Sequence, residues 1–319
     1  MEFAFSEEQQ ELASTVRSLL DRRADPRVDD YDQTLWKTLC EQIGVAALGI
    51  PEEYDGVGAA FFETAIVLEE LGRCLAPSPF LATAVATEAL LAGGSEEAKG
   101  RLLPRIAAGE IATVALDVNQ VVLDADRAEI VLAVVGDDLV EVAHPETEWA
   151  ESMDQTIRLG YLIDPTDYEV IGDGRAARGR AELVGAAGVT ALQAGLAARA
   201  LEMTVSYSKE RVQFGRPIGS FQALKHRMAD MLVLLEMSRS ASWAASYAVS
   251  RWADNAEDLT HVAKAYCGDA LKHIAAETVQ LHGGIAITWE HDAHLVLKRA
   301  HALGHLFGAS GEHRAMLAL

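Results

Sequence analysis

Basic side chains gather in the stretch KERVQFGRPIGSFQALKHR, residues 209–227, although the chain as a whole is acidic. The 319 residues carry a formal net charge of −21. This stretch nevertheless holds one acid, Glu210, and five basic residues: Lys209, Arg211, Arg216, Lys225 and Arg227. Arg211 is expected in the last turn of a helix, where a positive charge complements the helix dipole. An arginine at such a bend also suits a pyrophosphate, because its guanidinium donates forked hydrogen bonds. The residues alone leave both roles open, a stabilised helix end and a site for a small phosphorylated ligand.

Histidines near the C-terminus have spacings that could serve a metal or a proton relay. His301 and His305 are four residues apart, as in helical zinc sites. Because no third ligand is evident, this spacing predicts a packed or interfacial pair and no metal. His291, Asp292 and His294 are likewise expected to pin the last helices through hydrogen bonds. No arrangement of serine or cysteine with histidine indicates a nucleophile.

Hydrophobic periodicity divides the chain into three zones that must position these residues. Residues 1–112 are expected to form a helical N-terminal domain. Residues 113–182 are expected to form a short β domain, in which EIVLAVVGDDLVEVA predicts two strands around a turn. Residues 183–319 carry long apolar stripes at helical spacing, which predict a C-terminal four-helix bundle. The predicted fold class is therefore α+β and mostly α.

Several helix ends can be predicted from single residues. Ser6, followed by Gln9, is typical of a capped helix start. Gly72 is expected to end the helix that begins at Phe61. In the basic stretch, Gly215 is expected to end one helix, and Ser220 is expected to cap the next.

Composition excludes several classes of protein. Residues 110–175 hold sixteen acids and three basic residues, a net charge of −13, which predicts a solvated, acid-coated β module. Such acidity argues against nucleic acid as a partner, because binding to phosphates needs a basic surface. No apolar run reaches about 18 residues, so no membrane span is expected. The acidic start is unlike a secretory signal, and three widely spaced cysteines predict reduced thiols in the cytoplasm.

Five motifs resemble the acyl-CoA dehydrogenase family. They are FSEEQQELASTVR, GIPEEYDGVGAAFFETAIVLEELGRCLAPSP, LLPRIAAGE, RVQFGRPIGSFQALKHRMADM and QLHGGIAITWEHDAHLVLKRA. The resemblance covers roughly residues 1–116 and 183–319. It implies the acyl-CoA dehydrogenase fold, with a helical N-terminal domain, a β middle domain and a C-terminal four-helix bundle.

The resemblance also implies FAD, bound across a subunit interface. In the family the flavin ring lies on one subunit, and the bundle of a neighbour binds the adenosine-diphosphate half. In this chain the implied cofactor-binding residues are Arg211, Phe214, Gln222, Gln280, Leu281, His282, Gly283 and Gly284. The basic stretch would then bind the diphosphate, because two negative charges in a partly dry crevice need paired cations. Gly283 and Gly284 would let the backbone approach the ligand closely.

Two departures from the family pattern bear on the mechanism. Family members carry the catalytic carboxylate at one of two positions, and here those positions hold Phe307 and Gly185. Neither can accept a proton, so no catalytic residue is assigned to this chain. The nearest acids, Glu182 and Glu312, are expected to be surface charges. The middle zone is also too short and lacks the strand segment that holds the flavin ring in the family.

These losses leave three alternatives. The first is the small subunit of a heteromeric α2β2 acyl-CoA dehydrogenase, in which a full-length partner supplies the base and the ring site. Such assemblies are familiar in actinobacterial breakdown of steroid side chains as CoA esters, so that substrate class is expected. The second is a self-sufficient homo-oligomer with a relocated base such as Glu312. The third is a non-enzymatic helical scaffold that inherited the motifs.

Overall fold

The first third of the chain is helical, as predicted. The computed structural model describes residues 4–28 and 31–317. The helices and 3-10 turns of this part are α1 (Glu7–Arg23), α2 (Gln33–Ile43), η1 (Val45–Ala47), η2 (Glu52–Tyr54), α3 (Phe61–Cys74), α4 (Phe80–Gly93) and α5 (Glu96–Ala107). The predicted cap of α1 is confirmed, because the Ser6 hydroxyl accepts the N–H of Gln9, whose side chain accepts the N–H of Ser6.

Short strands occupy the middle of the chain. They are β1 (Ala112–Ala115), β2 (Val122–Leu123), β3 (Ile130–Val135), β4 (Asp138–Val142), β5 (Glu146–Trp149), β6 (Leu159–Ile163) and β7 (Tyr168–Asp173). One sheet has the order β1-β3-β4-β7, with β1 and β3 parallel and the other pairs antiparallel, and a second has the order β2-β6-β5. Buried valine and alanine side chains from both sheets form a small common core. The predicted pair of strands around a turn is confirmed as β3 and β4.

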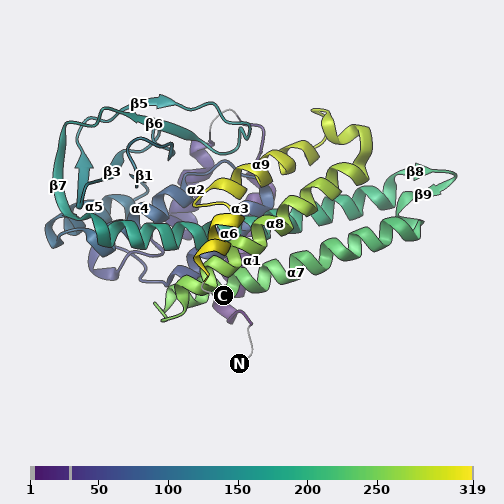
Figure 1. The fold of residues 1–319 in the computed structure, drawn as a ribbon, viewed down its shortest axis with the longest axis horizontal. Helices are drawn as coiled ribbons and strands as arrows, with labels where there is room; N and C mark the ends of the chain where they lie inside the picture. The colour runs from purple at the N-terminus through teal and green to yellow at the C-terminus, as the bar shows by residue number, and fades with distance from the viewer. Residues whose placement is uncertain (1–3, 29–30, 318–319) are drawn as a thin grey trace.

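The last part of the chain is a bundle of long helices. Its elements are α6 (Gly174–Glu210), β8 (Val212–Gln213), β9 (Arg216–Pro217), η3 (Ile218–Ser220), α7 (Gln222–Ser250), α8 (Ala256–His282), η4 (Gly283–Ile287), α9 (Ala293–His305) and α10 (Ser310–Met316). In Figure 1, α6, α7 and α8 run side by side, and the β8–β9 hairpin projects from one end of the molecule. Among the described residues only α6 is long and apolar enough to cross a bilayer, but 89% of that apolar window is buried in the protein. The predicted α+β, mostly helical architecture is confirmed.

Three helix boundaries differ from the prediction. Helix α6 ends at Glu210 and not at Gly215, which lies in the turn between β8 and β9. Helix α6 begins at Gly174, nine residues before the expected start of the bundle, because the Asp173 carboxylate accepts the backbone N–H of Arg175 and of the following residue. Gly72 does not end a helix but lies within α3. A Cβ at this position would overlap the backbone of Leu192, so the glycine allows α3 and α6 to pack closely.

The β module is fixed to the bundle by a buried ion pair. Arg299 of α9 lies 2.9 Å from the carboxylate of Asp154, in the loop between β5 and β6, and both side chains are almost fully buried. The same guanidinium donates to the carbonyl of Thr156 at 2.6 Å. Because a buried charge is costly without its partner, this pair holds the loop against α9.

The start of α9 is pinned as the sequence predicts. The His294 Nδ1–H donates to the carbonyl of His291 at 2.8 Å. Asp292 pairs with Arg27, in the chain after α1, and lies 3.9 Å from Arg199 of α6. These contacts join the N-terminal helices, α6 and α9 at one end of the bundle.

Candidate functional site

The predicted diphosphate-binding residues flank a tight hairpin at the end of the bundle. Helix α6 ends at Glu210, and Arg211 follows it as the exposed C-cap residue. Strands β8 and β9 are joined by Phe214 and Gly215, whose φ angles of 52° and 75° are those of a type I′ turn. The Phe214 side chain is 91% exposed. Gln222 begins α7 on the other side of the hairpin and is also exposed.

The helix cap predicted in this hairpin is not formed. Ser220 lies in the 3-10 turn before α7, and its hydroxyl donates to the carbonyl of Pro217 at 2.7 Å. Helix α7 therefore begins without a side-chain cap. The start of α7 lies at the same end of the bundle as the β8–β9 hairpin (Figure 1), and its first backbone N–H groups have no side-chain cap.

The cations of this hairpin lack acidic partners. Arg227 pairs with Glu277 at 2.8 Å, so the fifth basic residue of the stretch is already neutralised. The other four are exposed, and within the described residues none of them pairs with a carboxylate: Lys209, Arg211, Arg216 and Lys225. In a chain of net charge −21, this end of the bundle is a local concentration of free positive charge, which favours a polyanionic ligand.

The second predicted cofactor segment lies beside the last turn of α6. The rings of Tyr207 and His282 stack at 4.5 Å, so the C-terminal end of α8 lies one helical turn from Arg211. Gly283 has φ 66° and ψ −143°, which only glycine adopts without strain. A Cβ added at Gly283 or Gly284 would meet nothing within 4 Å. The backbone of both glycines is therefore open to a ligand.

Not every side chain of the Gln280–Gly284 segment is accessible to a ligand. Gln280 is exposed, but Leu281 and His282 are buried, at 6% and 3% exposure. The His282 Nδ1–H donates to the carbonyl of Thr278 at 2.7 Å, and burial lowers the pKa of the ring, so it is neutral. Any contact of Leu281 or His282 with a ligand comes through the backbone.

These observations fit the adenosine-diphosphate half of FAD. Arg211, Gln222 and the neighbouring cations offer charged and amide donors, and the open glycine turn offers backbone N–H groups. When bound, FAD supplies the acceptor for a hydride. The residues at this end of the bundle would hold its negatively charged tail in place.

The two positions at which the resemblance places the family's base are adjacent in space. Gly185 lies on α6, and Phe307 lies in the turn between α9 and α10 with φ 52°. A Cβ added at Gly185 would lie 2.5 Å from both Cδ1 and Cζ of the Phe307 ring. The ring therefore fills the space that any larger residue at 185 would occupy. Neither side chain can take up a proton.

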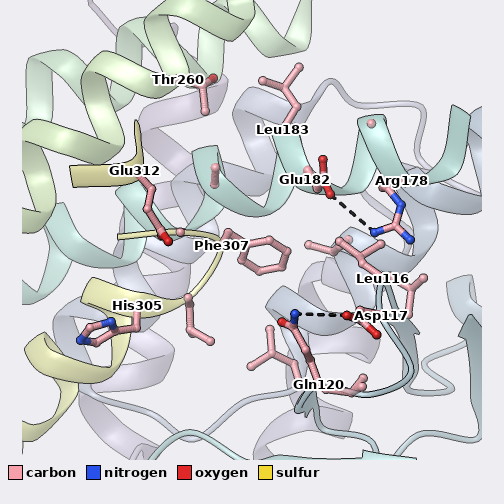
Figure 2. A pocket seen from close by; sticks show the side chains of 18 of the residues that line it. Leu116, Asp117, Gln120, Arg178, Glu182, Leu183, Thr260, His305, Phe307 and Glu312 are labelled. Atoms are coloured by element: carbon pink, nitrogen blue, oxygen red, sulfur yellow. Dashed lines mark hydrogen bonds and ion pairs between the residues drawn. The ribbon is translucent and has the colours of Figure 1, made fainter. Parts of the chain in front are cut away.

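The nearest acids, Glu182 and Glu312, are both exposed, as predicted for surface charges, but they lie closer to this point than the sequence indicated. Glu182 and Glu312 line one cavity with Phe307 (Figure 2). Glu182 lies 3.8 Å from the guanidinium of Arg178. A carboxylate oxygen of Glu312 accepts the backbone N–H of Ala309 at 2.7 Å, so this acid caps the start of α10.

A buried polar cluster holds the Phe307 turn. Lys264 of α8 donates to the carbonyl of Gly308 at 2.6 Å, and burial lowers the pKa of its ammonium to about 8. The Nε2 of His313 lies 2.7 Å from the carbonyl of Phe307, and its Nδ1 lies 2.8 Å from Nδ1 of His261. Because a carbonyl only accepts, His313 carries its proton on Nε2 and accepts the Nδ1–H of His261.

Sequence analysis did not identify this cluster. The one available signal was Lys264 itself, a lysine between Thr260 and Cys267 on the apolar face of α8, where all three residues are buried. The partners of Lys264 lie about forty residues away along the chain, so periodicity could not find them.

Comparison with known proteins finds similar proteins over nearly the whole chain. Family models match for the acyl-CoA dehydrogenase N-terminal domain over residues 6–110 and for the C-terminal domain over residues 174–318. The chain is 41% identical over 316 residues to acyl-CoA dehydrogenase IpdE2 of Mycolicibacterium smegmatis, covering 96% of each protein. A solved variant of the Tcur3481-Tcur3483 steroid ACAD is similar with a TM-score of 0.88 at 26% identity, covering 97% of this chain and 96% of that one. The ChsE4-ChsE5 complex from Mycobacterium tuberculosis shares the fold with a TM-score of 0.86 at 23% identity, covering 99% of this chain and 97% of that one.

The packing of Phe307 on Gly185 predicts the effect of a single methyl group. Gly185→Ala is expected to lower the free energy of unfolding by about 1–3 kcal/mol, because the ring must move. Gly179→Ala is the matched control in the same helix, since a Cβ there meets nothing within 4 Å, and it should be neutral or stabilising by up to about 1 kcal/mol. In Gly185→Ala/Phe307→Ala, urea denaturation should show a coupling of at least about 0.5 kcal/mol. Strict additivity would contradict the contact.

The buried histidines predict a loss of stability in acid. Burial lowers the pKa of His282, His291 and His313 below the ordinary value, so the unfolded chain binds protons at a higher pH than the folded chain does. The free energy of unfolding should therefore fall as the pH drops through about 6.5. Urea denaturation at pH 7.5 and 5.5 measures this fall, which should be smaller in His313→Asn than in the exposed control His226→Asn. An equal fall in both variants would argue against the buried, neutral His313.

Proposed function

The chain belongs to the acyl-CoA dehydrogenase family, and on that premise we propose that it is the non-catalytic subunit of a heteromeric enzyme. The assembly oxidises acyl-CoA thioesters to their α,β-unsaturated forms. This chain binds the adenosine-diphosphate half of FAD through Arg211, Gln222 and the Gln280–Gly284 segment. A longer partner subunit of the same family supplies the base, the flavin-ring site and most of the substrate site.

The observation that carries this proposal is the ring of Phe307 packed on Gly185. Removal of a proton next to the thioester requires a carboxylate or another base within hydrogen-bond reach. The two positions that would hold this base carry a phenyl ring and a glycine, and they fill each other's space. A subunit built in this way depends on a partner for proton abstraction.

The hairpin at the end of the bundle supports the second part of the proposal, that this chain binds the cofactor. Four exposed cations without acidic partners and an open glycine turn remain where an adenosine diphosphate would bind. A chain that had lost every link to the cofactor would gain nothing from holding unpaired positive charges together, since they repel one another. This retention favours an active cofactor-binding subunit over an inert scaffold.

The similar proteins support the assembly and the substrate class. The ChsE4-ChsE5 complex and the Tcur3481-Tcur3483 steroid ACAD are each named for two components. By analogy we assign this chain to an α2β2 heterotetramer that acts on CoA esters derived from steroids. The expected location is the cytoplasm.

One observation favours a second candidate, a self-sufficient homo-oligomer. Glu182 and Glu312 both line the cavity next to Phe307, where a relocated base would have to lie. Against this candidate, Glu312 already accepts the N–H of Ala309, and Glu182 lies beside the guanidinium of Arg178. Both carboxylates therefore already have a partner within this chain.

The proposal predicts that activity requires a second gene product. The chain expressed alone should contain little flavin and should not reduce a dye with any acyl-CoA. Co-expression with a full-length relative that carries the missing carboxylate should yield a yellow complex that reduces the dye. Turnover by the homomeric chain would overturn the proposal and favour the second candidate, and Glu312→Gln would then identify the base.

Arg211→Ala should lower the FAD content of the co-expressed complex. The substitution removes a forked donor to the diphosphate, and a hydrogen bond to a charged group contributes about 1.5–3 kcal/mol, which corresponds to a roughly tenfold or greater loss of affinity. The flavin-to-protein absorbance ratio after gel filtration measures the effect. Arg22→Ala, an exposed arginine on α1, is the matched control and should keep full occupancy. Unchanged flavin in Arg211→Ala would contradict the assigned diphosphate contact.

A further inference from the structure

The cavity beside Phe307 has a volume of about 790 Å³, within the range of small-molecule sites. It lies between the segment that joins β1 to β2, the first turns of α6, the start of α8, and the turn that leads into α10. Figure 2 shows its wall, with the Phe307 ring between Glu312 on one side and Glu182 on the other. The cavity is far from the hairpin that is assigned to FAD, because it lies at the opposite end of α6 and α8.

Much of the cavity wall is apolar. Aliphatic side chains line it from α4, the β module and the bundle: Val85, Leu116, Val122, Leu159, Leu183 and Leu306. The Phe307 ring adds an aromatic surface. Such a wall binds a compact hydrophobic body by removing its surface from water.

The charged groups of the wall are mostly carboxylates. The lining acids are Asp117, Glu182, Glu257 and Glu312, and the lining guanidinium is that of Arg178. Arg178 lies 3.8 Å from Glu182, so it offsets one of the four negative charges. The Lys264 ammonium lies behind the wall and is directed at the carbonyls of Gly308 and Leu303.

Three histidines also line the wall: His261, His305 and His313. Burial lowers the pKa of His313, and its neutral ring accepts the Nδ1–H of His261. The other nitrogen of His261 lies 3.7 Å from the carboxylate of Glu257. This arrangement leaves the carboxylates in excess around an aromatic ring.

We propose that this cavity binds an organic ammonium ion with a compact apolar body. The body packs against the aliphatic wall. The positive charge faces the Phe307 ring and the surrounding carboxylates, since a cation is attracted both to the face of an aromatic ring and to negative charge. The site is separate from FAD binding and does not depend on the proposed heteromeric assembly.

The same charges disfavour the ligand that family membership would suggest for this position. An acyl-CoA thioester carries several phosphate charges, and the carboxylates around the cavity repel them. Phe307 also closes the cavity toward Gly185, so a thioester here would meet no carboxylate at either of these two positions. Electrostatics therefore separates this cavity from a working acyl-CoA site.

Three probes on one skeleton test the assignment: 1-naphthylmethylammonium, 1-naphthylmethanol and 1-naphthylacetate. Calorimetric titration of the full-length chain at low salt should give at least about tenfold tighter binding of the ammonium than of the alcohol or the acid. Added salt should reduce this preference, because it screens the exposed carboxylates. Equal affinity for all three, tighter binding of the acid, or no binding of the ammonium at millimolar concentration would overturn the proposal.

Variants locate the binding. Glu182→Gln/Glu257→Gln should lower affinity for the ammonium several-fold and leave the alcohol unchanged, and Phe307→Leu should act in the same direction. Leu183→Trp should fill the cavity from the α6 side, and Leu116→Trp should fill it from the β module. If one of these variants does not fold, the other still tests whether the ligand binds in the cavity. Leu232→Trp, on the exposed face of α7, is the matched control. Full ammonium binding in a folded Leu183→Trp or Leu116→Trp variant would place the ligand elsewhere and overturn the proposal.

Discussion

The packing of the Phe307 ring against Gly185 is the contact on which the account of this chain depends. It joins the turn before α10 to the N-terminal third of α6, at the two positions where the resemblance places the base of the family. Lys264 and His313 form hydrogen bonds with backbone carbonyls of this turn, so a buried polar network fixes the position of the ring. A carboxylate cannot be introduced at either position without disrupting this contact.

The distribution of charge supports a division of roles along the bundle. The β module and the cavity are acidic, whereas the far end of α6 and the start of α7 carry free cations. A polyanionic dinucleotide is therefore attracted to one end of the molecule and repelled from the other. Both ends belong to the same long helices, and α6 connects them through a core in which glycines allow close approach to α3.

Much of the fold was predictable from the sequence, because its signals are local. The capping box at Ser6 and the strands around the Gly136 turn follow directly from neighbouring residues. The short strands β2, β5 and β6 were missed, since two to five residues with mixed exposure carry little periodicity. Gly72 does not end a helix as expected. A glycine is needed there because the position packs closely against Leu192, which lies 120 residues away in the chain, so neighbouring residues do not reveal it.

The candidate site was predictable only in part. The motifs identified the basic stretch and the two expected base positions, but not the β8–β9 hairpin, the contact between Phe307 and Gly185, or the cavity beside them. A crystal structure of the co-expressed complex with FAD tests the central claim most directly. The account predicts the diphosphate beside Arg211 of this chain and the isoalloxazine ring on the partner subunit. An isoalloxazine ring bound within copies of this chain, next to one of its own ionisable side chains, would contradict it.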